Sequence, residues 1–120
     1  MKKEVILKTK SFAFAVRVTR LYKYIQENKQ EYILNKQLLR SGTAIGALVR
    51  EAQNAESTAD FIHKLAIAQK ECDETMYWLE LLKQTDYISK KEFESMNNDA
   101  VELLKMIRSA VITVKKTQRS

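Results

Sequence analysis

The side chains best suited to catalysis are scarce in this chain. It contains one histidine, His63, and one cysteine, Cys72. Asp60-Phe-Ile-His63 is a single approximate copy of the Glu-x-x-His motif, which carboxylate-bridged di-iron bundles use in two copies. His63 and Cys72 fall on one expected helix, too far apart along it for proton transfer between them. We therefore expect no metal site, no cofactor and no Cys–His catalytic pair.

Three carboxylates, Glu71, Asp73 and Glu74, fall within four residues and are the other chemical possibility. On a helix this spacing spreads the side chains around the axis, so a catalytic site would need partners from other helices. A hydrolase that uses these carboxylates remains a third hypothesis, which a divalent metal bound among them would support. We expect a protein that is not an enzyme.

Basic residues are numerous and unevenly distributed. Residues 1–50 hold 11 Lys/Arg and 3 Asp/Glu, residues 51–104 hold 5 and 12, and residues 105–120 hold 5 and none. A basic surface attracts nucleic acid, and oppositely charged surfaces on one molecule favour head-to-tail self-association. The residues predicted to bind phosphate are Arg17, Arg20, Lys23, Lys36, Arg40 and Arg50. The alternatives are a solvated face, or pairing of Arg40 and Arg50 with Glu51, Glu71 or Glu74.

Four segments with apolar residues at helical spacing must position these side chains. The predicted helices span about 11–28, 32–54, 58–85 and 90–115, with capping boxes at Ser57–Asp60 and Ser89–Glu92. The chain has no proline and only two glycines, so hairpin turns have no local support. Short loops favour antiparallel neighbours, so we predict an all-α fold, an up-down-up-down antiparallel four-helix bundle in one domain over 1–120. The pattern of residues 1–10 fits either an extension of the first helix or a segment crossing a neighbour.

Both glycines, Gly42 and Gly46, lie inside the second predicted helix, where together they cost about 2 kcal/mol relative to alanine. The apolar stripe of that helix is predicted to comprise Leu34, Leu38, Ser41, Ile45, Leu48 and Ala52. The glycines fall on the flank of this stripe, beside Val49. We expect them to mark a close helix contact, either inside the bundle or between subunits. Arg40 and Arg50 bracket the segment and exclude a membrane dimer of the small-x-x-x-small type.

A set of short motifs also resembles a known family. These motifs are Leu39-Arg-Ser41, Ile45-Gly-Ala-Leu-Val-Arg-Glu51, Asp60-Phe61, Leu65, Ile67-Ala68, Glu74, Leu79 and Tyr87-Ile88. In order and spacing, from about Ser11 to Val114, they resemble the four-helix-bundle proteins encoded in intervening sequences of bacterial large-subunit ribosomal RNA. The accessory variability proteins of diversity-generating retroelements belong to the same superfamily. The resemblance implies an up-down bundle that assembles into a ring, typically a pentamer, with a basic surface and no enzymatic activity. In the retroelement branch it also implies a reverse transcriptase as partner.

These observations lead to one functional hypothesis and one alternative. We expect a homo-oligomeric bundle that binds RNA or DNA electrostatically through a basic surface on the first two helices. The alternative is a protein-interaction scaffold or accessory subunit that does not touch nucleic acid. The lone cysteine fits a reducing compartment, and no apolar run approaches the roughly 20 residues of a membrane span, so we expect a cytoplasmic protein.

Overall fold

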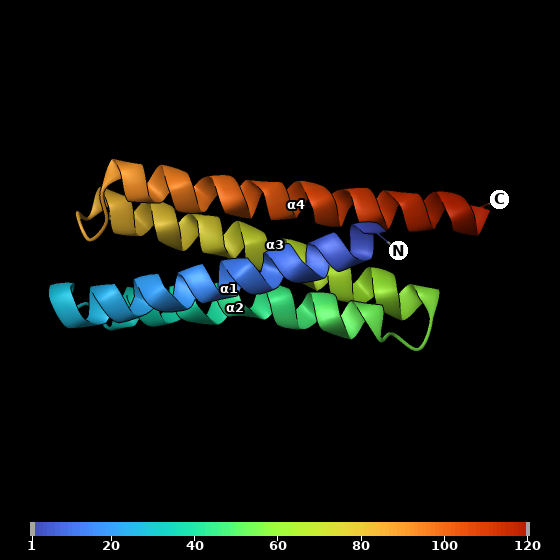
Figure 1. Ribbon diagram of the computed structural model, residues 1–120, viewed down its shortest axis with the longest axis horizontal. Helices are drawn as coiled ribbons and strands as arrows, with labels where there is room; N and C mark the ends of the chain where they lie inside the picture. The colour runs from blue at the N-terminus through green and yellow to red at the C-terminus, as the bar shows by residue number, and fades with distance from the viewer. Residues whose placement is uncertain (1, 120) are drawn as a thin grey trace.

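Four antiparallel helices make up almost all of the chain in the computed structural model, which describes residues 2–119. The helices are α1 (Lys2–Lys29), α2 (Ile33–Gln53), α3 (Thr58–Gln84) and α4 (Lys90–Arg119). Successive helices run in opposite directions in an elongated bundle, with both chain ends at the same end of the molecule (Figure 1). The predicted all-α up-down-up-down four-helix bundle is confirmed, and no strand occurs within residues 2–119.

The first and last helices are longer than the sequence pattern predicted. α1 begins at Lys2 rather than near residue 11, because Leu7 is buried and continues the apolar face toward the N-terminus. α4 extends to Arg119, past the predicted end near residue 115. Residues 2–10 of the ambiguous segment 1–10 therefore extend the first helix, and residue 1 lies outside the described residues.

Side-chain caps account for the start of two helices. At α4, the Glu92 backbone N–H donates to the Ser89 hydroxyl at 3.0 Å, and the Glu92 carboxylate accepts from the Ser89 backbone N–H at 2.8 Å. At α3, the Asp60 backbone N–H donates to the Ser57 hydroxyl at 3.0 Å, but the Asp60 carboxylate accepts from the N–H of Glu56. The predicted capping box is complete at α4 and half complete at α3.

The buried face of α2 differs from the predicted stripe. Its buried residues are Asn35, Leu38, Ser41, Gly42, Ile45, Gly46, Val49 and Ala52. Gly42, Gly46 and Val49 thus lie within the buried face rather than on its flank, whereas Leu34 and Leu48 are only partly buried. The physical reason is that α2 packs against both α1 and α3, so it buries two adjacent stripes.

The two glycines lie at the contact between α1 and α2. A Cβ atom added at Gly46 would lie 3.2 Å from the Ser11 carbonyl oxygen of α1. One added at Gly42 would lie 2.7 Å from a methyl carbon of Val18, which is fully buried. The helices approach this closely because neither glycine carries a side chain, so the close contact of α2 is made inside the bundle.

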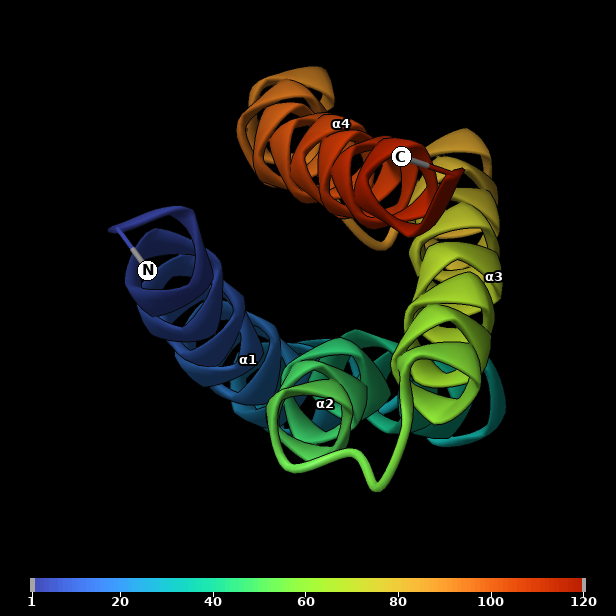
Figure 2. The ribbon, with the colours of Figure 1, turned by 90° about the vertical axis from the view of Figure 1, so that its right-hand side faces the viewer.

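The bundle is least closed between its first and last helices. Figure 2 shows α1 and α4 standing apart, while α1–α2, α2–α3 and α3–α4 lie side by side. Two ion pairs link α1 to α4 near their middles: Lys10 with Glu102 at 2.9 Å, and Arg17 with Asp99 at 2.6 Å. We call this contact the α1–α4 seam. A hollow lies on the seam to either side of these pairs.

Candidate nucleic-acid interface

One of these hollows is a cationic groove between the second half of α1 and the first turns of α4. It has a volume of about 470 Å³. Its lining residues are Arg17, Arg20, Leu21, Tyr24, Lys91, Glu92, Ser95 and Met96. We call it the α1–α4 groove. Three of its residues are cations and one is an exposed aromatic, so it offers both charge and a ring to a ligand.

Arg17 is fixed in place by α4. Its Nη1 donates to the Asp99 carboxylate at 2.6 Å, and its Nη2 donates to the Ser95 hydroxyl at 2.8 Å. Asp99 offsets part of the charge of Arg17, so Arg17 attracts an anionic ligand less strongly than an unpaired cation would. Its clearest role is to hold α1 against α4 at one end of the groove.

Arg20 and Lys91 supply the available charge of the groove. Both are exposed, and neither has an ion-pair partner among the residues that the structure describes. They reach the groove from different helices, Arg20 from α1 and Lys91 from α4. Among the described residues that line this hollow, Glu92 is the one that is negatively charged, and its carboxylate already accepts a hydrogen bond from the backbone N–H of Ser89.

The other predicted phosphate-binding residues do not join this groove. Lys23 and Lys36 are exposed but lie outside its lining. Arg40 faces the opposite side of the bundle, where it pairs with Glu71 and Glu74 of α3. Arg50 lies over the Phe12 ring, 5.2 Å from its centroid. The six predicted cations therefore do not form one continuous surface, because α2 turns its arginines toward α3 and toward the start of α1.

The Arg40 contacts form a small polar network between α2 and α3. The Arg40 guanidinium bonds both carboxylates, and the Glu74 carboxylate also accepts from the Trp78 indole N–H at 3.2 Å. The hydrogen bonds from Arg40 and then Trp78 lower the pKa of Glu74. In the core beside it, the Thr75 hydroxyl donates to the Ser41 hydroxyl at 3.0 Å. This network matches the alternative of Arg40 pairing with Glu71 and Glu74, and it aligns the two helices.

Of the eight residues that line the groove, only Arg17 and Arg20 were among the predicted phosphate-binding residues, and the polar residues Tyr24, Lys91, Glu92 and Ser95 were not. Tyr24 follows Arg17 at a spacing of seven residues, which places both on one face of α1. Lys91 lies in the first turn of α4, just after its cap. The predicted antiparallel arrangement of the first and last helices could have pointed to these residues, since it places the start of α4 opposite the second half of α1.

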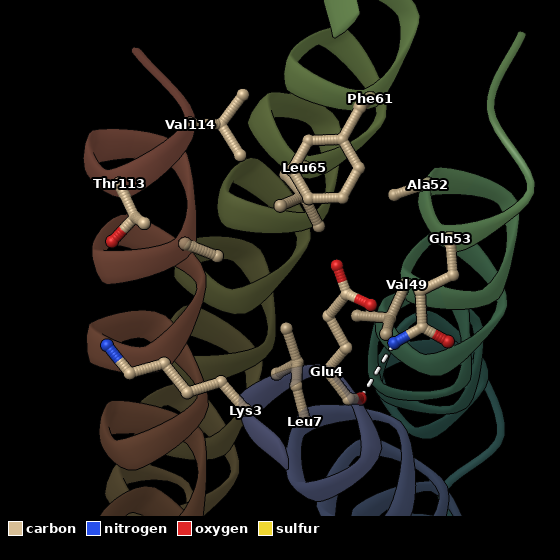
Figure 3. A pocket seen from close by; sticks show the side chains of 11 residues that line it. Lys3, Glu4, Leu7, Val49, Ala52, Gln53, Phe61, Leu65, Thr113 and Val114 are labelled. Atoms are coloured by element: carbon tan, nitrogen blue, oxygen red, sulfur yellow. Dashed lines mark hydrogen bonds between the residues drawn. The ribbon is translucent and has the colours of Figure 1, made fainter. Parts of the chain in front are cut away.

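The second hollow is an apolar cavity at the other end of the seam, with a volume of about 140 Å³ (Figure 3). All four helices line it, through Lys3, Glu4, Leu7, Val49, Ala52, Gln53, Phe61, Leu65, Ala110, Thr113 and Val114. The Gln53 side-chain amide donates to the Glu4 carbonyl oxygen at 2.7 Å. Lys3 and Glu4 put opposite charges at its edge, and the walls are mainly apolar. This cavity is the incompletely covered end of the core, with no converging set of polar groups.

The side chains with catalytic potential do not assemble. Among residues 2–119, no group of three or more His, Cys, Asp or Glu side chains is placed to hold a metal ion. Cys72 is buried, and this burial raises its pKa to about 12, so the thiol stays protonated. His63 is exposed. None of the helices, within the part of the chain described, is apolar and long enough to cross a bilayer.

The fold and the groove define a class of small antiparallel helical bundles with an open seam between the first and last helices. The chain belongs to the 23S rRNA-intervening sequence protein family, whose sequence profile matches residues 3–109. The family resemblance found in the short motifs is thereby confirmed.

A solved structure supports the same assignment. It is that of a protein with unknown function from the S23 ribosomal protein family of Bacteroides thetaiotaomicron. The two chains are 51% identical over 91% of this chain and 97% of that one, and their TM-score is 0.90. No curated protein matches the chain.

Proposed function

We propose that this protein is a non-enzymatic nucleic-acid-binding bundle, which attracts phosphates through the α1–α4 groove. The observation that carries the proposal is the placement of Arg20 and Lys91, cations without an ion pair among residues 2–119, on opposite walls of one groove. The buried thiol of Cys72, and the engagement of the Glu71 and Glu74 carboxylates by Arg40, support a binding role over a catalytic one. The hypothesis from sequence placed the basic surface on the first two helices, and the groove geometry now favours the first and fourth.

Binding of this kind should weaken steeply as salt rises, because it depends on counterion release. The test is fluorescence anisotropy with labelled RNA and DNA over a series of salt concentrations. Arg20→Gln and Lys91→Gln each remove one phosphate-binding cation, so each should make the negative slope of log K against log salt shallower by about 0.7 to 0.9. Lys36→Gln is the matched control, since Lys36 is an exposed cation outside the groove. Absence of binding at low salt, or equal effects of all three variants, would contradict the proposal.

We further propose that the protein works as a homo-oligomeric ring in the cytoplasm, with a pentamer as the ring size that the resemblance implies. Two observations support self-association: the opposite charges of residues 1–50 and 51–104, and exposed apolar side chains such as Val5, 62% exposed, and Phe12, 55% exposed. In the retroelement branch of the superfamily, the implied partner is a reverse transcriptase.

The same apolar side chains favour a second candidate function, a protein-interaction scaffold without direct nucleic-acid binding. Ile33, 77% exposed at the start of α2, is the most accessible of them. The two functions differ in whether Arg17, Arg20 and Lys23 stay accessible in the assembled protein. Burial of these residues against a neighbouring subunit, measured by hydrogen exchange or a structure of the assembly, would favour the scaffold.

A further inference from the structure

We infer that the α1–α4 groove accepts an unpaired nucleotide, so that the ligand class of this protein is single-stranded nucleic acid. The inference rests on the proposed nucleic-acid binding and makes it more specific. Three features of the groove carry it: its hollow between two helices, the exposed ring of Tyr24, and the cations that line the same groove.

The shape of the groove favours a base that is free to enter it. The groove is an open hollow of about 470 Å³ between two helices, which a flat group projecting from a ligand can enter. The bases of a duplex are stacked and paired inside the helix, and exposing one requires unstacking that costs a few kcal/mol. A single strand exposes its bases without that cost.

The surfaces inside the groove suit the flat face of a base. Tyr24 is 45% exposed and therefore presents much of its ring to solvent. Leu21 of α1, which is partly buried, and Met96 of α4, which is 4% exposed, form an apolar floor beneath the same hollow. Every base has a π-face, so stacking on an aromatic side chain provides affinity with little dependence on sequence.

Cations line the groove beside Tyr24, where they can bind the phosphates of a stacked nucleotide. Arg20 precedes Tyr24 by four residues, one helical turn, and so lies next to it on the same face of α1. Lys91 reaches the groove from α4, and Arg17 lies a further turn along α1. Because Arg17 is fixed by Asp99 and Ser95, it shapes the groove while Arg20 and Lys91 remain available to phosphates.

The test compares two labelled probes of equal length and charge, an oligouridylate and a hairpin duplex, by fluorescence anisotropy with the full chain. We expect the oligouridylate to bind about ten-fold more tightly than the hairpin. Tyr24→Ala should weaken oligouridylate binding about ten-fold and leave hairpin binding unchanged, whereas Tyr24→Phe should keep the wild-type preference. Tyr77→Ala is the matched control, because Tyr77 is 57% exposed on α3 and lies outside the groove.

The outcomes separate the inference from the function on which it rests. Equal affinity for both probes, or unchanged oligouridylate binding by a Tyr24→Ala variant of wild-type helicity, would overturn the inference and leave nucleic-acid binding standing. Weakening by Tyr77→Ala to the same extent as by Tyr24→Ala would also overturn it. Failure of the wild-type chain to bind either probe would overturn both proposals.

Discussion

Gly42 and Gly46 occupy equivalent positions on one helix but meet different obstacles. At Gly42 an added Cβ would contact both methyl groups of Val18, at 2.7 and 2.8 Å, and Val18 is fully buried. At Gly46 the nearest atom is the Ser11 carbonyl oxygen at 3.2 Å, so a shift of a few tenths of an ångström suffices. The requirement for glycine is therefore stricter at position 42.

We predict that Gly42→Ala destabilises the protein although alanine is the better helix former. Overpacking against Val18 costs about 1–3 kcal/mol, which exceeds the roughly 1 kcal/mol gained in helix propensity. Adding Val18→Ala should relieve the clash, so that the double mutant is more stable than the sum of the single changes implies. Urea unfolding followed by circular dichroism measures each free energy.

Gly46→Ala serves as the matched control for this prediction. Here the gain in propensity and the small backbone adjustment should nearly cancel, which gives little change in the unfolding midpoint. If Gly42→Ala were as mild as Gly46→Ala, or if Val18→Ala and Gly42→Ala were additive, the steric account of position 42 would be wrong.

The sequence pattern placed Gly42 and Gly46 on the flank of the apolar stripe, whereas the structure buries both. One apolar stripe therefore does not define the whole buried face of a helix. The pattern of leucines and isoleucines predicted a buried face running through Leu34 and Leu48, and the structure turns that face toward Asn35 and Val49. Asn35 is buried, and its side-chain amide donates to the Tyr22 carbonyl oxygen of α1 at 2.8 Å, which offsets part of the cost of burying a polar group. Whether a polar residue or a glycine can be buried depends on the atoms that it meets on the neighbouring helix. The periodicity of apolar residues within one helix does not reveal those contacts.

At the scale of the helices, the seam between α2 and α3 gives a pH-dependent prediction. The pKa of Glu74 is lowered by its hydrogen bond from Arg40. A carboxyl group with a lowered folded pKa stabilises the protein above its unfolded pKa of about 4.3, and this stabilisation is lost as pH falls through the folded pKa. Arg40→Gln should therefore lower the thermal midpoint at neutral pH. In acid, where Glu74 is protonated, the variant and the wild type should have the same midpoint.

The size of the Arg40 effect is limited by exposure. The Arg40 and Glu74 side chains are 49% and 38% exposed, so solvent and salt screen the pair and its contribution stays below about 1 kcal/mol. Lys90→Gln is the control, because its ion pair with Glu94 is longer, at 3.9 Å, and more exposed. A loss of stability on Arg40→Gln that is equal at neutral and acid pH would show that Arg40 acts by packing and not by charge.

The open end of the α1–α4 seam gives a second prediction about how the helices pack. Ala110 of α4 lines the apolar cavity of about 140 Å³, so Ala110→Leu places extra carbon atoms in space that is already lined by apolar groups. Each buried methylene contributes roughly 0.8 kcal/mol, and we expect a gain of about 1–2 kcal/mol in unfolding free energy. Ala66→Leu on the exposed face of α3 should change stability little. Destabilisation by Ala110→Leu would show that the helices leave no room there.

The positions of the helices in the chain could be predicted from the sequence far better than the contacts between residues of different helices. Apolar spacing and the Ser89–Glu92 capping box were enough to place α4. The groove was harder, since Arg17 and Arg20 were identified but their companions on α4 were not. Lys91 and Tyr24 become one site only when the first and last helices are set side by side, and this contact joins residues far apart in the chain.

For the molecule as a whole, we predict self-association through the outer face of α1. Val5 and Phe12 are seven residues apart and therefore lie on one face of α1, where both are more than half exposed although Arg50 lies over the Phe12 ring. Size-exclusion chromatography with light scattering should give a mass several times the 14.0 kDa of one chain. Replacement of both residues with glutamate should lower that mass toward 14.0 kDa without loss of helicity.

Charge should contribute to the same assembly. If the basic surface of one copy faces the acidic surface of another, high salt will weaken the association by screening. Ile33→Glu, at the first residue of α2 and outside α1, is the control for introducing a charge at an exposed apolar position. A monomeric mass for the wild-type chain at every protein concentration would contradict the prediction. A mass unaffected by the double glutamate change would place the interface elsewhere on the bundle.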